Sequence, residues 1–294
     1  MLALGDLALR QGDYTRAVED LEASLTLYRE AGDRRGEAHP LSILGWIAAE
    51  RDDLERAEGL LEESLALSRA AGTAREVSIM LNALAAVELY RGDYARATEL
   101  QEECLNLSRV AGDVRSIAIY SHNLALTAAM TGEYERAETF VREAQEMYRE
   151  HGDDTGVAHA DVLFGFLALS RNDPDRAEEF CVGAIRVFRE RAQTPGIDFA
   201  LDVLAGVAAA RGEIRRAARL WGAASGSREE TGAPWIPEER TMIEPHIDAA
   251  HTRLDEVDWT KAWEDGRSMT LDQAVSYALE DSRERAIDHA SGRP

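Results

Sequence analysis

Residues 12–32 read GDYTRAVEDLEASLTLYREAG, and residues 92–112 read GDYARATELQEECLNLSRVAG. Both stretches contain an Arg-Ala pair that recurs every 40 residues, at positions 16–17, 56–57, 96–97, 136–137, 176–177 and 216–217. A unit of this length is one supersecondary element that cannot bury its apolar face alone, so neighbouring units must stack. The spacing therefore predicts a solenoid of six repeating units.

Three columns of residues indicate that each unit contains two packed helices. A small residue lies twelve positions before the repeated alanine, at Gly5, Gly45, Ala85, Ala125, Gly165 and Ala205. An apolar residue follows the alanine by four positions, at Leu21, Leu61, Val141, Cys181 and Trp221, with Gln101 as the exception. A second small residue follows it by seven positions. Spacings of three and four are typical of the buried stripe of a helix, and small residues let two helices approach closely.

The expected helix ends carry residues that tolerate a left-handed backbone. Each first helix, of about a dozen residues, is expected to end at Gly12, Asp52, Gly92, Gly132, Asn172 or Gly212. An acidic residue follows each of them and is expected to cap the second helix, at Asp13, Asp53, Asp93, Glu133, Asp173 and Glu213. The second helices are expected to end at Gly32, Gly72, Gly112 and Gly152.

These columns resemble those of the tetratricopeptide repeat, with a longer period. The resemblance covers residues 1–230 and implies an all-α fold, a right-handed α-solenoid of six helix pairs with units starting near residues 1, 41, 81, 121, 161 and 201. Residues 231–294 depart from the repeat rhythm, with Gly232, Pro234 and Pro237 at their start. They are expected to form a helical C-terminal cap, because a terminal repeat lacks its next neighbour.

The composition and the missing motifs argue against several classes of function. A net charge of -22 disfavours direct binding of nucleic acid, because Lys and Arg neutralise phosphate backbones. The sequence has no phosphate-binding loop, serine elbow or His-Glu-x-x-His motif, so we expect no enzyme, no catalytic residue, no metal and no cofactor. Cys104 and Cys181 fall in buried columns and are expected to be core residues. No signal peptide or membrane span is expected, and the predicted location is cytoplasmic.

The first helices line the concave face of a tetratricopeptide solenoid, and the resemblance implies which side chains lie there. They are Trp46, Asn82, Tyr90, His122, Leu126, His159, Phe166 and Asp202, with Ile79 and Ile119 nearby. This mostly apolar lining suits an amphipathic helix of a protein partner or a small neutral ligand. The other interpretation is that the aromatic residues only pack against adjacent helices. We predict a protein-interaction or signal-sensing scaffold, with a small-ligand sensor that uses the groove as the alternative.

The two ends of the chain suggest a larger assembly. Residues 217–224, AARLWGAA, and 262–266, AWEDG, resemble the C-terminal end of large LuxR-related bacterial regulators. This resemblance implies the sensor part of a transcriptional regulator, without its nucleotide-binding or DNA-binding domain. At the other end, an apolar cluster has no preceding helix to cover it, at Leu2, Leu4, Leu7 and Leu9. A missing domain, a homodimer contact or fraying of the first helix is expected there.

Overall fold

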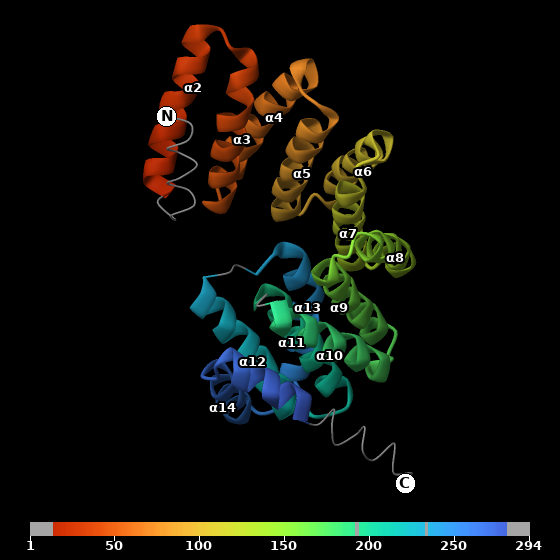
Figure 1. Ribbon diagram of the computed structural model, residues 1–294. Coiled ribbons are helices and arrows are strands. Elements are labelled where there is room, and N and C mark those ends of the chain that lie inside the picture. The colour runs from red at the N-terminus through yellow and green to blue at the C-terminus, as the bar shows by residue number, and fades with distance from the viewer. Residues whose placement is uncertain (1–13, 192–193, 233–234, 281–294) are drawn as a thin grey trace. The chain divides into compact units, whose positions relative to one another are not determined.

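The protein is helical throughout the residues that its structure describes. The computed structural model describes residues 14–191, 194–232 and 235–280. These ranges contain no β-strand, and their helices are α2 (Tyr14–Ala31), α3 (Arg34–Glu50), α4 (Leu54–Ala71), α5 (Ala74–Arg91), α6 (Tyr94–Ala111), α7 (Val114–Met130), α8 (Tyr134–Glu150), α9 (Asp154–Ser170), α10 (Pro174–Arg191), α11 (Thr194–Ala210), α12 (Ile214–Thr231), α13 (Pro237–His251) and α14 (Glu256–Arg267) (Figure 1). Residues 271–280 are also helical. The expected all-α fold is confirmed.

The chain divides into two compact units, Met1–Leu124 and Ala125–Pro294, which we call unit 1 and unit 2. In unit 1, α3 packs against α4 and α5 against α6, and in unit 2, α9 packs against α10 and α11 against α12. We call α3, α5, α7, α9 and α11 the first helices and the even-numbered helices from α2 to α12 the second helices. The C-terminal segment belongs to unit 2, because α13 contacts α11 and α12, and α14 contacts α12.

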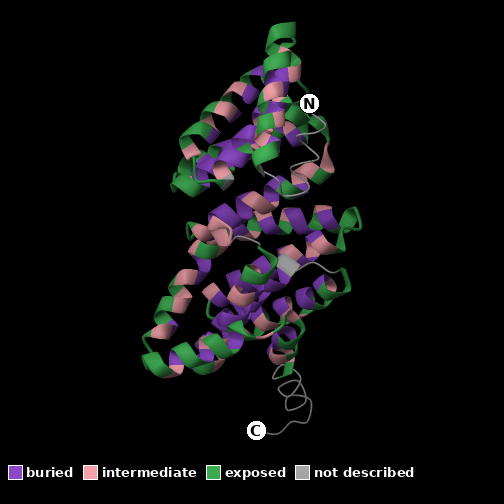
Figure 2. Cartoon of the chain, turned by 90° about the vertical axis from the view of Figure 1, so that its left-hand side faces the viewer, coloured by how far each residue is buried: buried purple, intermediate pink, exposed green. Residues whose placement is uncertain are grey.

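The repeated columns form the core, as the sequence predicts. The repeated alanine is fully buried at Ala17, Ala57, Ala97, Ala137, Ala177 and Ala217. The small residues twelve positions before this alanine lie where the first helix contacts the second. A β-carbon on Gly45 would lie 2.7 Å from Cγ of Leu61, and one on Gly165 would lie 2.7 Å from Sγ of Cys181. Figure 2 shows buried residues running along most of the helices, with exposed residues on their other sides. Small residues therefore set how closely the two helices of a repeat approach.

The left-handed column that ends the first helices is confirmed at every described position. Asp52 and Asn172 have φ angles of 62° and 59°, which few residues other than glycine adopt, and the glycines of this column also have positive φ. The aspartates that follow cap the second helices: Asp53, Asp93 and Asp173 each accept a hydrogen bond from the backbone N–H three residues later.

Two expectations about the helix ends are wrong, whereas the expected end of α4 at Gly72 is confirmed, with Gly72 in an extended conformation (φ of -91°) as its C-cap. Glu133 and Glu213 make no capping bond, and the Glu133 carboxylate instead accepts hydrogen bonds from the side chains of Thr131 and Arg136. The first helices have 17 or 18 residues, more than the dozen expected, because each starts just after the preceding second helix ends.

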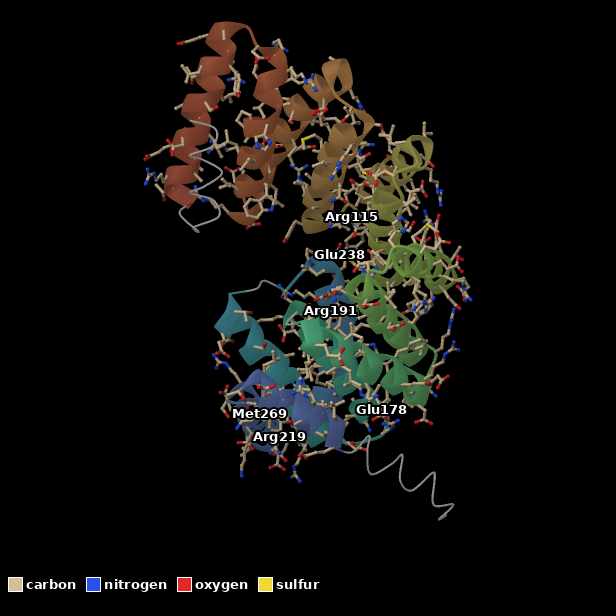
Figure 3. All side chains as sticks on the ribbon, in the orientation of Figure 1. Arg115, Glu178, Arg191, Arg219, Glu238 and Met269 are labelled. Atoms are coloured by element: carbon tan, nitrogen blue, oxygen red, sulfur yellow. The ribbon has the colours of Figure 1, made fainter. Side chains whose placement is uncertain are left out.

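Residues 217–224 and 262–266 meet in one contact between α12 and α14. A β-carbon on Gly222 would overlap the carbonyl oxygen of Trp263, and one on Gly266 would overlap that of Arg219. The side chain of Arg219, labelled in Figure 3, pairs with Asp265 at 2.9 Å. Backbone contact between these helices therefore requires glycine at both positions. The expected apolar cluster at Leu2 to Leu9 and the homodimer contact at that end lie outside the described residues.

Candidate functional site

Unit 1 exposes large apolar side chains on its first helices. Trp46 of α3 is 41% exposed and Tyr90 of α5 is 44% exposed, and Ile79 of α5 and Ile119 of α7 are exposed as well. Each of these helices buries other apolar residues in the core, such as Ile47, Leu81 and Ala118, so the four residues lie on the solvent side of their helices. We call these four residues the open face of unit 1.

A pocket of about 340 Å³ adjoins the open face, between α3, α4 and α5. Ile79 belongs to the open face and also lines the pocket, and Leu67 and Met80 are further apolar residues in the pocket wall. Two of the hydroxyl groups in its wall have partners: Ser64 donates to the carbonyl of Ala38 at 2.7 Å, and Ser42 donates to that of His39 at 2.7 Å. The wall also contains Arg35, His39, Ser68 and Glu76, so the pocket combines apolar contact with polar and charged groups.

Two of the predicted polar residues, Asn82 and His122, are half-buried in unit 1. The side-chain amide of Asn123 donates to Oδ1 of Asn82 at 2.9 Å, which ties α7 to α5. The Asn82 side chain therefore helps to hold these two first helices together, and its Oδ1 is already engaged in a hydrogen bond within the protein.

The same columns are buried in unit 2. The column of Trp46 continues every 40 residues through Ala86, Leu126, Phe166 and Gly206. Ala86 is exposed, but Leu126, Phe166 and Gly206 are buried, and Phe166 is only 2% exposed. The expectation that Leu126 and Phe166 line an accessible surface is therefore wrong.

Two contacts close this column in unit 2. First, α9 packs directly against α11, where a β-carbon on Gly206 would lie 2.5 Å from Cδ2 of Leu169. Second, α13 packs on α11, and its His246 ring meets the Phe166 ring edge-on, with the centroids 6.1 Å apart. Figure 1 shows α13 beside α9 and α11. A helix of the chain itself thus covers in unit 2 the column that unit 1 leaves open.

Asp202 is also buried, so its expected place in an accessible groove is wrong. It forms an ion pair with Arg228 of α12 at 2.5 Å. Burial raises the pKa of the Asp202 carboxyl, and the charge of Arg228 opposes this rise. Arg228 also lies over the ring of Trp235, 4.9 Å from its centroid. Sequence reasoning missed Arg228 and Trp235, because neither lies in a first-helix column.

His159 is half-buried and belongs to a packing contact. Its ring lies 4.7 Å from that of Phe188, centroid to centroid. Burial lowers the pKa of His159, which favours the neutral ring. Of the eight predicted lining residues, Trp46 and Tyr90 are therefore the ones that the structure leaves exposed.

The remaining His, Cys, Asp and Glu side chains were compared with the arrangement that a metal site requires. Among the residues that the structure describes, no three His, Cys, Asp or Glu side chains are grouped so that they could hold a metal ion. Cys104 and Cys181 are buried free thiols, and burial raises the pKa of Cys104 to about 12, so the thiol stays protonated. In the described part of the chain, no helix combines the length and the apolar character needed to cross a bilayer.

Comparison with solved structures shows the fold class. The chain is similar to BtubC from P. vanneervenii, with 21% identity, a TM-score of 0.60, and coverage of 75% of this chain and 93% of that one. It is also similar to the apo form of RapI, with 11% identity, a TM-score of 0.64, and coverage of 86% and 98%. Kinesin light chain TPR-like repeats from Podosopora anserina match with 14% identity, a TM-score of 0.50, and coverage of 67% and 96%. At these identities the likeness extends to the fold alone.

The family comparison agrees with the repeat columns. No curated protein matches the sequence. The tetratricopeptide repeat model matches residues 1–70 and 76–150. The buried alanines and the left-handed helix ends recur through the same segments. The chain therefore carries tetratricopeptide repeats over residues 1–70 and 76–150.

Proposed function

We propose that this protein is a non-catalytic interaction scaffold that binds a protein partner through the open face of unit 1. One observation carries the proposal. Of the seven large hydrophobic residues exposed in the described part of the chain, four belong to this face. Exposed apolar groups that cluster on one surface are typical of protein-binding sites. The tetratricopeptide repeats in this segment support the same role.

Unit 2 indicates what kind of segment fits such a face. There, α13 packs on Phe166 of the column of Trp46, and this helix buries Met242, Ile243 and Ala250 while Asp248 is exposed. We propose that the partner likewise presents an amphipathic helix, with its apolar side against Trp46, Ile79, Tyr90 and Ile119. Because the chain carries a net charge of -22, a partner helix with basic flanking residues gains from long-range attraction.

A paired comparison of variants tests this proposal. The double variant Trp46→Ala/Tyr90→Ala removes most of the aromatic area of the open face. Val110→Ala is the matched control, because Val110 is 88% exposed but lies on the second helix α6. A partner should be captured from a lysate of the source cells by wild type and by Val110→Ala, and at least tenfold less by the double variant. Equal capture by all three proteins, with unchanged circular dichroism, contradicts the proposal.

A small-ligand sensor is the second candidate, and the pocket between α3, α4 and α5 favours it. A volume of about 340 Å³ with a partly apolar wall suits a neutral metabolite. Native mass spectrometry of the purified protein separates the two candidates. A co-purifying small molecule that is lost in Met80→Trp, which fills the pocket, supports the sensor, whereas its absence beside a protein partner supports the scaffold.

We further propose that the partner belongs to a bacterial, cytoplasmic regulatory system. The support is the resemblance of residues 217–224 and 262–266 to the C-terminal end of LuxR-related regulators. The net charge of -22 supports a division of labour in which another chain or domain contacts DNA. Identifying the captured partner tests this: we expect a protein with a nucleotide-binding or DNA-binding domain, and a partner with neither contradicts the regulatory role.

A further inference from the structure

Helix α13 covers Phe166 in unit 2, but it buries few residues of its own. Of its 15 residues, Met242, Ile243 and Ala250 are buried, whereas α12 buries nine of its 18 residues. Pro245 lies inside α13 and has no backbone N–H, so one intrahelical hydrogen bond is missing there. The free energy that holds α13 on the first helices is therefore small compared with that of α12.

A cavity beside α13 removes further contacts. It has a volume of about 250 Å³, and it is lined by Ile247 of α13 and by three indole rings, those of Trp221, Trp235 and Trp263. Side chains that border empty space lose the dispersion contacts that a filled core supplies. The side of α13 that carries Ile247 is therefore packed less completely than a core helix.

The neighbours of α13 are anchored without it. Backbone contact holds α14 on α12 at Gly222, and Arg267 of α14 pairs with Glu229 of α12 at 2.8 Å. The segment after α13 is tied to α11, because the guanidinium of Arg253 donates to the carbonyl of Ala209 at 2.9 Å. Helix α13 can therefore leave the face that it covers while α11, α12 and α14 keep their contacts with one another.

The start of α13 places carboxyl groups beside other buried carboxyl groups. Glu238 and Glu239 of α13 lie near Asp198 and Asp202 of α11, which are both 1% exposed. Arg228 of α12 is the cation that faces this cluster, and it pairs with Asp202 at 2.5 Å and lies 3.9 Å from Glu239. Since one guanidinium cannot neutralise four carboxylates, the docked position of α13 is most stable while some of these groups are protonated.

We propose that α13 is a reversible cover, which opens without unfolding the helices beneath it and so controls access to the first-helix face of unit 2. The face that it uncovers presents Phe166 at the position that Trp46 holds in unit 1. This face fits an amphipathic helix, and α13 is the occupant built into the chain. The match to a helical partner rests on the function proposed for the open face, whereas the opening of α13 does not. Rising pH ionises the carboxyl cluster and favours the open state.

Amide hydrogen exchange of the full chain, read by mass spectrometry, tests the opening. Relative to their intrinsic rates, residues 237–251 should exchange at least about tenfold faster than α12 and α14, because a local opening costs less than unfolding the unit. Between pH 6 and pH 8.5, the protection of α13 should fall at least about tenfold more in wild type than in Glu239→Gln. Equal protection of the three helices overturns the reversible cover, and equal pH dependence in the two proteins overturns its control by the carboxyl cluster.

A labelled peptide of residues 237–251 tests which occupant the uncovered face accepts. Ile243→Ala in the full chain removes a buried contact of α13, and Val257→Ala in α14 is the control, because Val257 is 77% exposed. The peptide should bind Ile243→Ala at least about tenfold more tightly than wild type or the control, because apparent affinity follows the fraction of open molecules. Equal affinity for the three proteins, or no binding to Ile243→Ala, overturns the docking face. Loss of binding in Trp46→Ala/Tyr90→Ala would place the peptide on unit 1 and overturn it as well.

Discussion

Unit 1 and unit 2 use the same repeat columns, yet one leaves its first helices open and the other covers them. Trp46 and Phe166 occupy equivalent positions, and they are 41% and 2% exposed. The difference comes from neighbours distant in sequence, because α13 packs over the first helices of unit 2. The comparison teaches that a repeat fixes which side of a helix faces its partner helix. Whether the other side meets solvent depends on what the rest of the chain places there.

The largest expected effect is the contrast between Phe166→Ala and Trp46→Ala. A buried phenylalanine truncated to alanine costs about 3–5 kcal/mol of unfolding free energy, through lost burial and a cavity. Trp46→Ala should cost less, about 1–2 kcal/mol, because 41% of its surface already meets water. Urea unfolding of both variants measures this. Equal losses would show that the two faces do not differ.

The C-terminal segment of unit 2 can also be loosened, at the contact between α12 and α14. Gly222→Ala should destabilise the protein by about 1–3 kcal/mol, because the new methyl overlaps the Trp263 carbonyl. Gly183→Ala in α10 is the matched control, since nothing lies within 4 Å of its added β-carbon. That variant should gain up to about 1 kcal/mol from better helix propensity. Thermal melts of the two variants and the wild type measure these changes. A Gly222→Ala protein with the wild-type melting temperature would rule out the tight backbone contact.

The cover on unit 2 should also weaken with rising pH. Burial raises the pKa of Glu239 in α13 to about 8, from the ordinary value of 4.5 that it regains on unfolding. Folding therefore takes up a proton between these values, and the free energy of unfolding falls as pH rises through them. Asp198, Asp202 and Glu238 have raised pKa values too and act in the same direction, whereas Arg228 keeps its charge.

Comparing wild type with Glu239→Gln measures this dependence. Wild type should lose at least about 1 kcal/mol of stability between pH 5 and pH 8, since each pKa unit corresponds to about 1.4 kcal/mol. The variant, which cannot ionise, should lose clearly less. Parallel curves for the two proteins would show that Glu239 is ionised in the folded state throughout this range.

The smallest expected effect concerns the helix caps. Asp93→Ala in unit 1 removes a side-chain bond to the N–H of Arg96 and should cost about 1 kcal/mol. Glu133→Ala in unit 2 removes no capping bond and should cost less, mainly its pairing with Arg136. Chemical denaturation of the two variants ranks them. The reverse order would mean that the longer side chain caps its helix after all.

The sequence predicts most of the fold, because the fold depends on local repeats. The buried alanine column and the left-handed residues such as Asp52 and Asn172 lie where the 40-residue alignment expects them. The capping hydrogen bonds are predicted less well. Asp and Glu are both acidic and share one column, but Glu has the longer side chain, and Glu133 makes no capping bond.

The candidate surface is predicted only in unit 1. Trp46 and Tyr90 are exposed as expected, but Leu126, Phe166 and Asp202 are buried by packing between elements far apart in the chain. The repeat columns do not predict that α13 packs against the first helices of unit 2. The pocket lined by Trp221, Trp235 and Trp263 was missed for the same reason, because these residues come from different elements and meet only through the packing of the C-terminal segment on α12.

Oxidative footprinting of the free protein by hydroxyl radicals, read by mass spectrometry, tests the central contrast most directly. Trp46 and Phe166 occupy the same first-helix column in the two units, and they are 41% and 2% exposed. We predict that Trp46 is oxidised at least tenfold faster than Phe166, and that Tyr90 reacts readily. Similar oxidation rates for Trp46 and Phe166 would contradict an open face in unit 1 and a covered one in unit 2.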